Sequence, residues 1–95
     1  MQEIIQKDNN TVFIGQKEPM TYVMAVVTQF NSSNNSVVIK ARGKAISKAV
    51  DVAEIVRHRF INGLTVTNIK IDTEEVQREE GTMKISAIEI TLTKE

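Results

Sequence analysis

Residues 37–50 read VVIKARGKAISKAV, and this stretch decides the fold because a strand, a glycine and a helix start follow one another in it. The β-branched run at its beginning predicts a buried strand over residues 37–41. Gly43 then interrupts the chain, and Ile46, Ala49 and Val50 recur at the spacing of one helix face. We therefore expect a strand-to-helix corner centred on Gly43.

The same two patterns recur on both sides of this corner. Residues 11–15 predict a short strand, and Pro19 suits the first turn of a helix. The apolar stripe expected on that first helix is Met20, Val23, Met24, Val27 and Phe30. The stripe expected on the second helix is Ile46, Ala49, Val50, Ala53, Val56 and Phe60, and Asn62-Gly63 should end that helix. Two long strands, about 64–76 and 82–93, follow and should pair as a hairpin that turns near Gly81.

Both long strands change the phase of their apolar alternation. In the first, Leu64 and Val66 share one parity while Ile69 and Ile71 take the other. A slip of one residue moves side chains to the opposite face, so an uninterrupted strand would scatter them. We expect a β-bulge near Thr67-Asn68 and a second near Ser86-Ala87, with the outer hairpin projecting as an arm.

The order of elements predicts an α+β fold, that is, an α/β two-layer sandwich. In the order β-α-β-α-β-β, two helices should pack on one face of a four-stranded mixed sheet, with a protruding β-hairpin arm. We expect a flexible N-terminal segment over residues 1–10 and one domain over residues 11–95.

Composition excludes several classes of function. The 95 residues include no cysteine and one histidine, so disulfides, thiolate metal sites and most zinc sites are excluded. Asp51 and Glu54 have no convergent base or nucleophile, so we expect no enzyme, cofactor or metal. No apolar stretch reaches the roughly 20 residues of a membrane span, and Met1-Gln2-Glu3-Ile4 lacks a secretory start. We expect a cytoplasmic protein without a membrane partner.

Charge is balanced but unevenly distributed. Twelve basic and 12 acidic residues give a formal net charge of zero. No acidic residue lies between Pro19 and Val50, where four basic residues fall close together: Lys40, Arg42, Lys44 and Lys48. Acidic residues dominate the expected arm, at Asp72, Glu74, Glu75, Glu79 and Glu80. The chain is therefore neutral because it is polarised.

The corner around Gly43 has the chemistry of an anion site. A helix N-terminus presents unpaired N–H groups that favour a phosphate oxygen. Arg42 and Lys44 flank the corner, and Lys48 lies one helical turn further. Lys17, after the first strand, supplies another cation if the two loops adjoin. Such residues provide affinity for a phosphate backbone but little reading of sequence.

Residues 40–51, KARGKAISKAVD, followed by VRHRF at residues 56–60, closely resemble the Alba family of archaeal chromatin proteins. VFIGQK at 12–17, MTYV at 20–23 and SAIEI at 86–90 resemble other parts of that family, so the resemblance covers roughly residues 11–93. It implies a homodimer that binds double-stranded DNA, and often RNA, through two basic corners and two hairpin arms. It also implies a place on the chromosome, in the nucleoid.

The resemblance assigns roles to particular residues. It implies that Lys17, Arg42, Gly43, Lys44 and Lys48 form the contact set, with Tyr22 near the binding face or in the core. Arg59 and Phe60 match positions that the family uses in contacts between neighbouring dimers, although Phe60 also fits the core stripe.

Some residues depart from the family pattern. The first loop carries Gln16-Lys17 where members often have two lysines, and the arm is acidic, leaving Arg78 and Lys84 as its contacts. Because carboxylates repel the phosphates that border a minor groove, we expect weaker DNA binding than in typical members. An RNA-binding role on the same fold, or protein binding by the acidic arm, remains an alternative.

A second apolar face on the second helix indicates dimerisation independently of the resemblance. Val52 and Ile55 add apolar side chains on a face that adjoins the main stripe of the second helix, and we expect them at a dimer interface.

Overall fold

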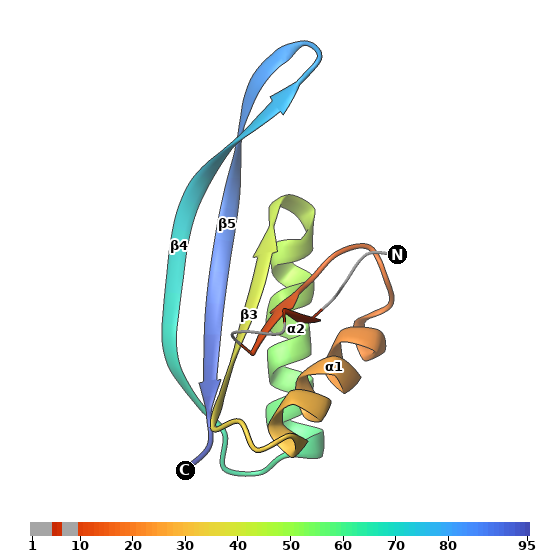
Figure 1. Cartoon of the computed structure of the whole chain (residues 1–95), viewed down its shortest axis with the longest axis vertical. Coiled ribbons are helices and arrows are strands. Elements are labelled where there is room, and N and C mark those ends of the chain that lie inside the picture. Colours follow the sequence, from red (N-terminus) through yellow and green to blue (C-terminus); the bar gives the residue numbers. More distant parts are fainter. Residues whose placement is uncertain (1–4, 7–9) are drawn as a thin grey trace.

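Two helices and a mixed β-sheet form the two layers of the molecule (Figure 1). The computed structural model describes residues 5–6 and 10–95. Its elements are β1 (Ile5–Gln6), β2 (Thr11–Phe13), α1 (Pro19–Asn31), β3 (Ser36–Arg42), α2 (Ile46–Ile55), β4 (Thr65–Arg78) and β5 (Gly81–Thr93). A short 3-10 turn, Gly43–Ala45, precedes α2, and a π-helical turn, Val56–Phe60, follows it. The predicted α+β class and its order of elements are confirmed.

The sheet has the strand order β1-β2-β3-β5-β4. Strands β2 and β3 run parallel, and the other neighbours are antiparallel. The four expected strands are present, and β1 adds a two-residue strand at the edge beside β2. The flexible segment predicted over residues 1–10 falls largely on residues 1–4 and 7–9, which lie outside the described residues.

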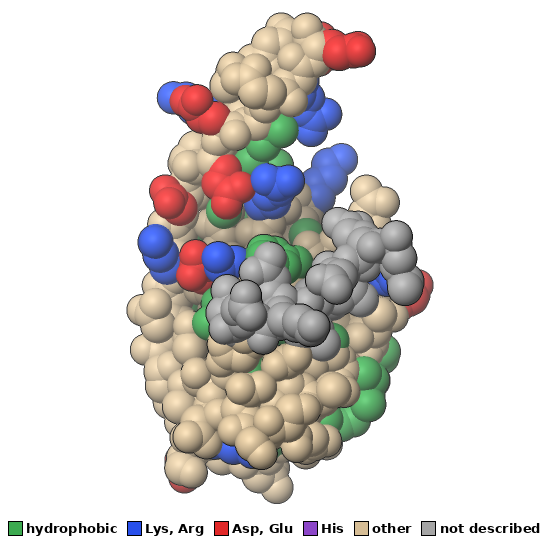
Figure 2. Space-filling view, in the orientation of Figure 1, with side chains coloured by type: hydrophobic (Ala, Val, Ile, Leu, Met, Phe, Trp, Pro, Cys, Tyr) green, Lys and Arg blue, Asp and Glu red, His purple; other side chains and the backbone are tan. Residues whose placement is uncertain are grey.

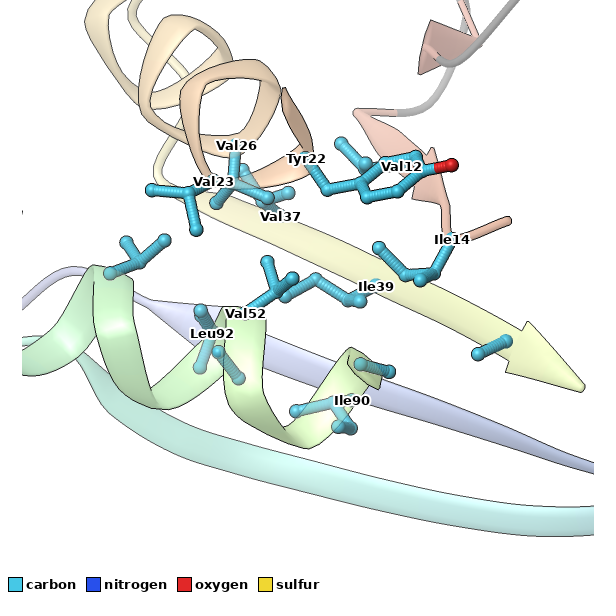
Figure 3. Packing of buried hydrophobic residues seen from close by; sticks show 14 of the residues in the cluster. Val12, Ile14, Tyr22, Val23, Val26, Val37, Ile39, Val52, Ile90 and Leu92 are labelled. Carbon is cyan, nitrogen blue, oxygen red and sulfur yellow. The ribbon is translucent and has the colours of Figure 1, made fainter. Parts of the chain in front are cut away.

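One hydrophobic core fills the space between helices and sheet. Val37 and Ile39 of β3 and Leu92 of β5 are fully buried against it. Figure 3 shows these side chains meeting those of α1 and α2. No residue of β4 is buried in this core. Leu64, which precedes β4, is buried in it, and Val66 of β4 packs at its margin. The core therefore covers only the inner end of the hairpin.

The predicted stripes of both helices need correction. On α1, Val23 and Phe30 are buried as expected, but Met20 and Met24 remain 47% and 48% exposed. The core face instead consists of Tyr22, Val23, Val26 and Phe30. This second stripe also has helical spacing. The helix is therefore rotated about its axis, relative to the predicted orientation, so that the ring of Tyr22 faces the core.

On α2 and the turn after it, Ala49, Ala53 and Val56 are buried as predicted. Val50 and Phe60 were expected in the same stripe but are 44% and 43% exposed. Val52 replaces Val50 in the core, because the stripe runs along the 49-52-53-56 positions. The predicted end of the helix agrees with Gly63, whose φ of 86° lies in the left-handed region.

The hairpin of β4 and β5 extends beyond both helices as an arm (Figure 1). Its register shifts once, between Val66 and Asn68, which confirms the bulge predicted at Thr67-Asn68. The second predicted bulge, at Ser86-Ala87, is wrong, because β5 pairs without interruption from Gly81 to Thr93. The apolar residues Met83 and Ile85 simply face the side opposite to Ile88 and Ile90.

No helix among the described residues is long and apolar enough to cross a membrane.

Candidate functional site

A groove of about 1240 Å³ lies at the foot of the arm. Its walls come from the loop after β2, the corner at Gly43 and the facing part of β4 and β5. Its basic lining residues are Lys17, Lys40, Arg42, Lys44, Lys48 and Lys70. Its acidic lining residues are Asp72, Glu74 and Glu89. The fold thus brings the predicted basic corner and Lys17 together, and places carboxylates of the arm opposite them.

Gly43 holds the corner in a conformation that favours glycine. Its φ is 60°, and a Cβ built there would lie 2.8 Å from Cδ1 of Ile85. The 3-10 turn that starts at Gly43 has no side-chain hydrogen bond at its N-cap, Arg42. Since orphan N–H groups at such a start attract anions, the backbone and the flanking cations point to the same ligand.

Lys48 is engaged with the backbone rather than directed freely outward. Its Nζ donates hydrogen bonds to the carbonyl oxygens of Gly15 and Lys17, at 2.9 and 2.8 Å. It also lies 5.9 Å from the ring centroid of Tyr22. The predicted phosphate contact of Lys48 therefore competes with its role of tying α2 to the loop after β2.

Tyr22 fixes the same loop from the other side. Its side chain is 3% exposed, and its hydroxyl accepts a hydrogen bond from the backbone N–H of Lys17 at 3.0 Å. Tyr22 thus packs its ring in the core and also lines the groove, and its contact with nucleic acid stays a prediction. We call the contacts of Tyr22 and Lys48 with Gly15 and Lys17 the loop clamp.

Two other cations of the groove pair with carboxylates. Arg42 Nη1 donates to Glu74 Oε1 at 3.0 Å, and Lys40 Nζ lies 3.7 Å from Glu89 Oε2. Lys40 also lies 5.9 Å from the ring centroid of Phe13. Figure 2 shows basic and acidic side chains side by side over the arm and the body next to it.

Lys17, Lys44 and Lys70 are the exposed cations of the groove whose side chains make no ion pair or hydrogen bond with the rest of residues 5–6 and 10–95. Gln16 is exposed beside Lys17 in the same wall. The three lysines and Gln16 are the side chains that a ligand would meet without first displacing an internal partner.

The two predicted contacts of the arm lie away from the groove. Arg78 ends β4, where a shallow hollow at the tip is lined by Val76, Gln77, Arg78, Glu79 and Glu80. Lys84 is exposed and pairs in register with Glu75. The structure therefore does not gather Arg78 and Lys84 with the other candidate residues.

The residues predicted at interfaces separate into two groups. Val52 is 0% exposed and points from α2 into the core (Figure 3), so it offers no surface to a second chain. Its burial corrects that prediction, because the core stripe takes up the side chain. Ile55 is half-buried, while Arg59 and Phe60 are exposed in the turn after α2.

The end of α2 carries a small charge cluster. Arg57 donates a hydrogen bond to Glu54, and His58 Nε2 lies 3.5 Å from the other carboxylate oxygen. The hydrogen bond from Arg57 lowers the pKa of Glu54, with help from the charges of Arg57 and His58. Nowhere in the described part of the chain do three His, Cys, Asp or Glu side chains gather as metal ligands would.

Several groove residues were not found from the sequence. Phe13 and Ile85 line it, as do Lys70 and Glu89, which lie opposite one another on β4 and β5. Their membership depends on strand register, since β3 pairs Lys40 with Glu89 across the sheet. A correct alignment of the three strands was the signal that could have found them.

A two-layer α+β domain with a projecting hairpin and a basic groove at its foot is the class of protein that this fold and site define. The Alba family model matches residues 10–73, and the chain belongs to the Alba family. Membership of this family bears out the expectation that the chain is not an enzyme.

Relatives agree over almost the whole chain. The DNA/RNA-binding protein Alba of Thermoplasma acidophilum is 56% identical over 87 residues, covering 92% of this chain and 98% of the relative. The DNA/RNA-binding protein Alba 1 of Archaeoglobus fulgidus is 60% identical over 85 residues, covering 90% and 96%.

Solved structures agree on the fold. Alba from Thermoplasma volcanium superimposes with a TM-score of 0.87 at 56% identity, covering 90% of this chain and 100% of that one. ALBA1 from Trypanosoma brucei has a TM-score of 0.75 at 22% identity, covering 94% and 72%, a likeness of fold alone.

Proposed function

We propose that this protein is a chromatin-type architectural protein that binds double-stranded DNA as a homodimer, mainly through the phosphate backbone. The observation that carries this proposal is the groove, in which Lys17 and Lys44 stand exposed beside an uncapped helical turn. Cations and N–H groups of this kind contact phosphate and give little sequence preference. The printed names of the relatives, which describe them as DNA/RNA-binding, support the same class of ligand.

A second candidate is RNA binding on the same surface. The phosphate contacts available to the groove are common to both nucleic acids, and the relatives' names include RNA. The acidic arm favours single-stranded RNA within this alternative, because its carboxylates disfavour entry into a duplex groove bordered by phosphates and a single strand has no such groove to enter. For the same reason we propose weaker DNA binding than in family members with a basic arm.

The homodimer is supported by an apolar surface on the arm. Ile69 and Ile71 are 58% and 77% exposed, and they share a face with Ile90 and Ile88 of the sheet. Side chains this apolar on one continuous strip are typical of an interface that a partner covers. Ile55 and the exposed Phe60 extend the apolar surface available on the helical side, Phe60 and Arg59 being our candidates for contacts between dimers.

A salt series of anisotropy titrations tests the binding site. Labelled duplex DNA and matched single-stranded and duplex RNA are titrated with wild type and Arg42→Ala/Lys44→Ala. The double variant should flatten the slope of log affinity against log salt by about 1.8 for duplex DNA, since each phosphate contact contributes about 0.9. Lys94→Ala, which removes a cation at the opposite end of the hairpin, should leave the slope unchanged. An unchanged slope in the double variant would contradict the site, and the ratio of affinities chooses between DNA and RNA.

Sedimentation equilibrium tests the dimer. Wild type should sediment as a dimer at micromolar concentration, and Ile71→Asp should shift it to monomer. Met83→Asp is the matched control, because Met83 is 50% exposed on the opposite face of the arm. A monomeric wild type would refute the dimer.

Co-sedimentation with chromosomal DNA from a lysate tests the proposed nucleoid location. Wild type should co-sediment with the DNA, and Arg42→Ala/Lys44→Ala should not.

A further inference from the structure

We propose that Glu74 of the arm competes internally with phosphate for Arg42, so that nucleic acid must displace this carboxylate before the guanidinium can bind it. The inference rests on the function proposed above and assigns a regulating residue to the same groove. It concerns one contact, the ion pair between the corner and the arm.

In that contact the carboxylate of Glu74 takes the place that a phosphate group would take beside Arg42. Arg42 Nη1 lies 3.0 Å from Glu74 Oε1, which is hydrogen-bond distance. A guanidinium presents its N–H donors as a planar fork that suits carboxylate and phosphate oxygens alike. An oxygen of Glu74 therefore occupies a donor that a phosphate would use.

The contact is weak enough to be displaced. The side chains of Arg42 and Glu74 are 59% and 48% exposed, so water and salt reach both. Exposed ion pairs of this kind contribute little to stability. Glu74 thus lowers the affinity of the groove without closing it.

Position on the strand makes Glu74 distinct from the other carboxylates of the arm. Glu74 lines the groove, whereas its neighbour Glu75 does not, because successive side chains of a strand point to opposite faces. Asp72 and Glu89 also line the groove, but Glu89 lies 3.7 Å from Lys40, a looser contact. Only Glu74 directly hydrogen-bonds a cation of the corner in the described part of the chain.

The arrangement ranks the cations of the groove. Lys17, Lys44 and Lys70 are available at once, and we infer that they make the first contacts with a phosphate backbone. Arg42 follows when its partner is exchanged from carboxylate to phosphate. The arm therefore reduces affinity through one defined residue as well as through its overall charge.

Neutralising Glu74 tests the inference against a matched neutralisation. Affinity for duplex DNA and for RNA is measured at low salt for wild type, Glu74→Gln, Glu75→Gln, Arg42→Ala and the two double variants with Arg42→Ala. Both single glutamine variants remove one negative charge from the same stretch of strand. Glu74→Gln should tighten binding about two- to fivefold more than Glu75→Gln, the range expected when one exposed ion pair is removed. In the Arg42→Ala background the two glutamine variants should bind alike.

The outcomes separate this inference from the proposed function. If wild type binds and Glu74→Gln equals Glu75→Gln, the competition is refuted while the nucleic-acid function stands. A weaker Glu74→Gln would also overturn it, because Glu74 would then position Arg42 for binding. If wild type binds neither nucleic acid at low salt, the proposed function itself fails. Urea unfolding of each variant verifies that the comparison is made between folded proteins.

Discussion

The two ends of the β4–β5 hairpin are joined by the same ladder of pairs but differ in what covers them. At the inner end, Leu92 is 0% and Ile90 3% exposed beneath the helices. At the outer end, Ile71 is 77% and Met83 50% exposed. Strand pairing alone therefore does not distinguish the two ends; burial does.

This difference separates stability from function within one element. Burying an aliphatic side chain contributes roughly 1.5–3 kcal/mol, so the inner end holds the hairpin in the domain. The outer end contributes little of that energy, and its side chains are free to carry charge towards the groove. An element anchored at one end can thus vary its free end without losing the fold.

The largest expected effect is at the inner end. Leu92→Ala should lower the free energy of unfolding by about 2–5 kcal/mol, because it leaves a cavity in a fully buried site. Met83→Ala at the outer end should lower it by less than about 1 kcal/mol. Urea denaturation followed by circular dichroism measures both. Equal losses would break the comparison.

A smaller effect is expected where the corner touches the arm. Gly43→Ala should cost about 1–2 kcal/mol from its left-handed backbone, with a further cost from the approach of the new Cβ to Ile85. Ile85→Val removes the Cδ1 atom that would lie 2.8 Å away, so it should restore part of the loss. Unfolding of the two single variants and the double variant measures this coupling. Strict additivity would show that the arm moves aside freely at this point.

The loop clamp should behave like the anchored end. Lys48→Ala removes two charge-assisted hydrogen bonds and should lower the free energy of unfolding by about 1–2 kcal/mol. Lys44→Ala should change stability by less than about 0.5 kcal/mol but lower the salt slope of DNA binding by about 0.9. The reverse pattern would identify Lys48 as the phosphate ligand and Lys44 as the structural residue.

The smallest effect concerns the exposed ion pair on the helical side. Arg57 lowers the pKa of Glu54, so the charged form of Glu54 stabilises the folded state above the ordinary pKa of a glutamate. That contribution is lost as the pH falls through the lowered pKa. Because the carboxylate is 47% exposed, Glu54→Gln should cost only a few tenths of a kcal/mol at pH 7 and nothing in strongly acidic buffer. Urea unfolding across pH measures this, and a difference that grows in acid would contradict the sign.

The sequence predicted the fold correctly wherever the spacing of apolar residues allowed only one buried face. The corner at Gly43, the bulge at Thr67 and the paired long strands followed from β-branched runs, glycine and a change of parity. The first helix had two overlapping stripes, and the spacing could not show whether Met24 or Tyr22 faced the core. In β5, a change of parity came from Ile85 facing the corner rather than from a second bulge.

Most cations of the candidate site were predicted from the sequence, but Lys70 and the partners of the cations were not. Arg42, Lys44 and Lys17 were identifiable because they cluster around two glycine loops. That Lys48 binds carbonyl oxygens, or that Glu74 lies beside Arg42, depends on register and on contacts 31 to 33 residues apart in the chain. No local pattern encodes such distances.

Because of the bulge at Thr67, the direction in which the arm projects can change without a change in the side chains that each face of the arm presents. Thr67 is the extra residue between Val66, which pairs with Leu92, and Asn68, which pairs with Thr91. Deleting it would restore regular alternation, with Ile69 and Glu74 keeping their faces, while the local bend would relax. Loss of this one codon would therefore re-aim the arm and leave its surface intact, whereas a deletion anywhere further along the strand would exchange its two faces. Descendants of this sequence can thus change the angle at which the arm projects through a single deletion, independently of the residues that it presents.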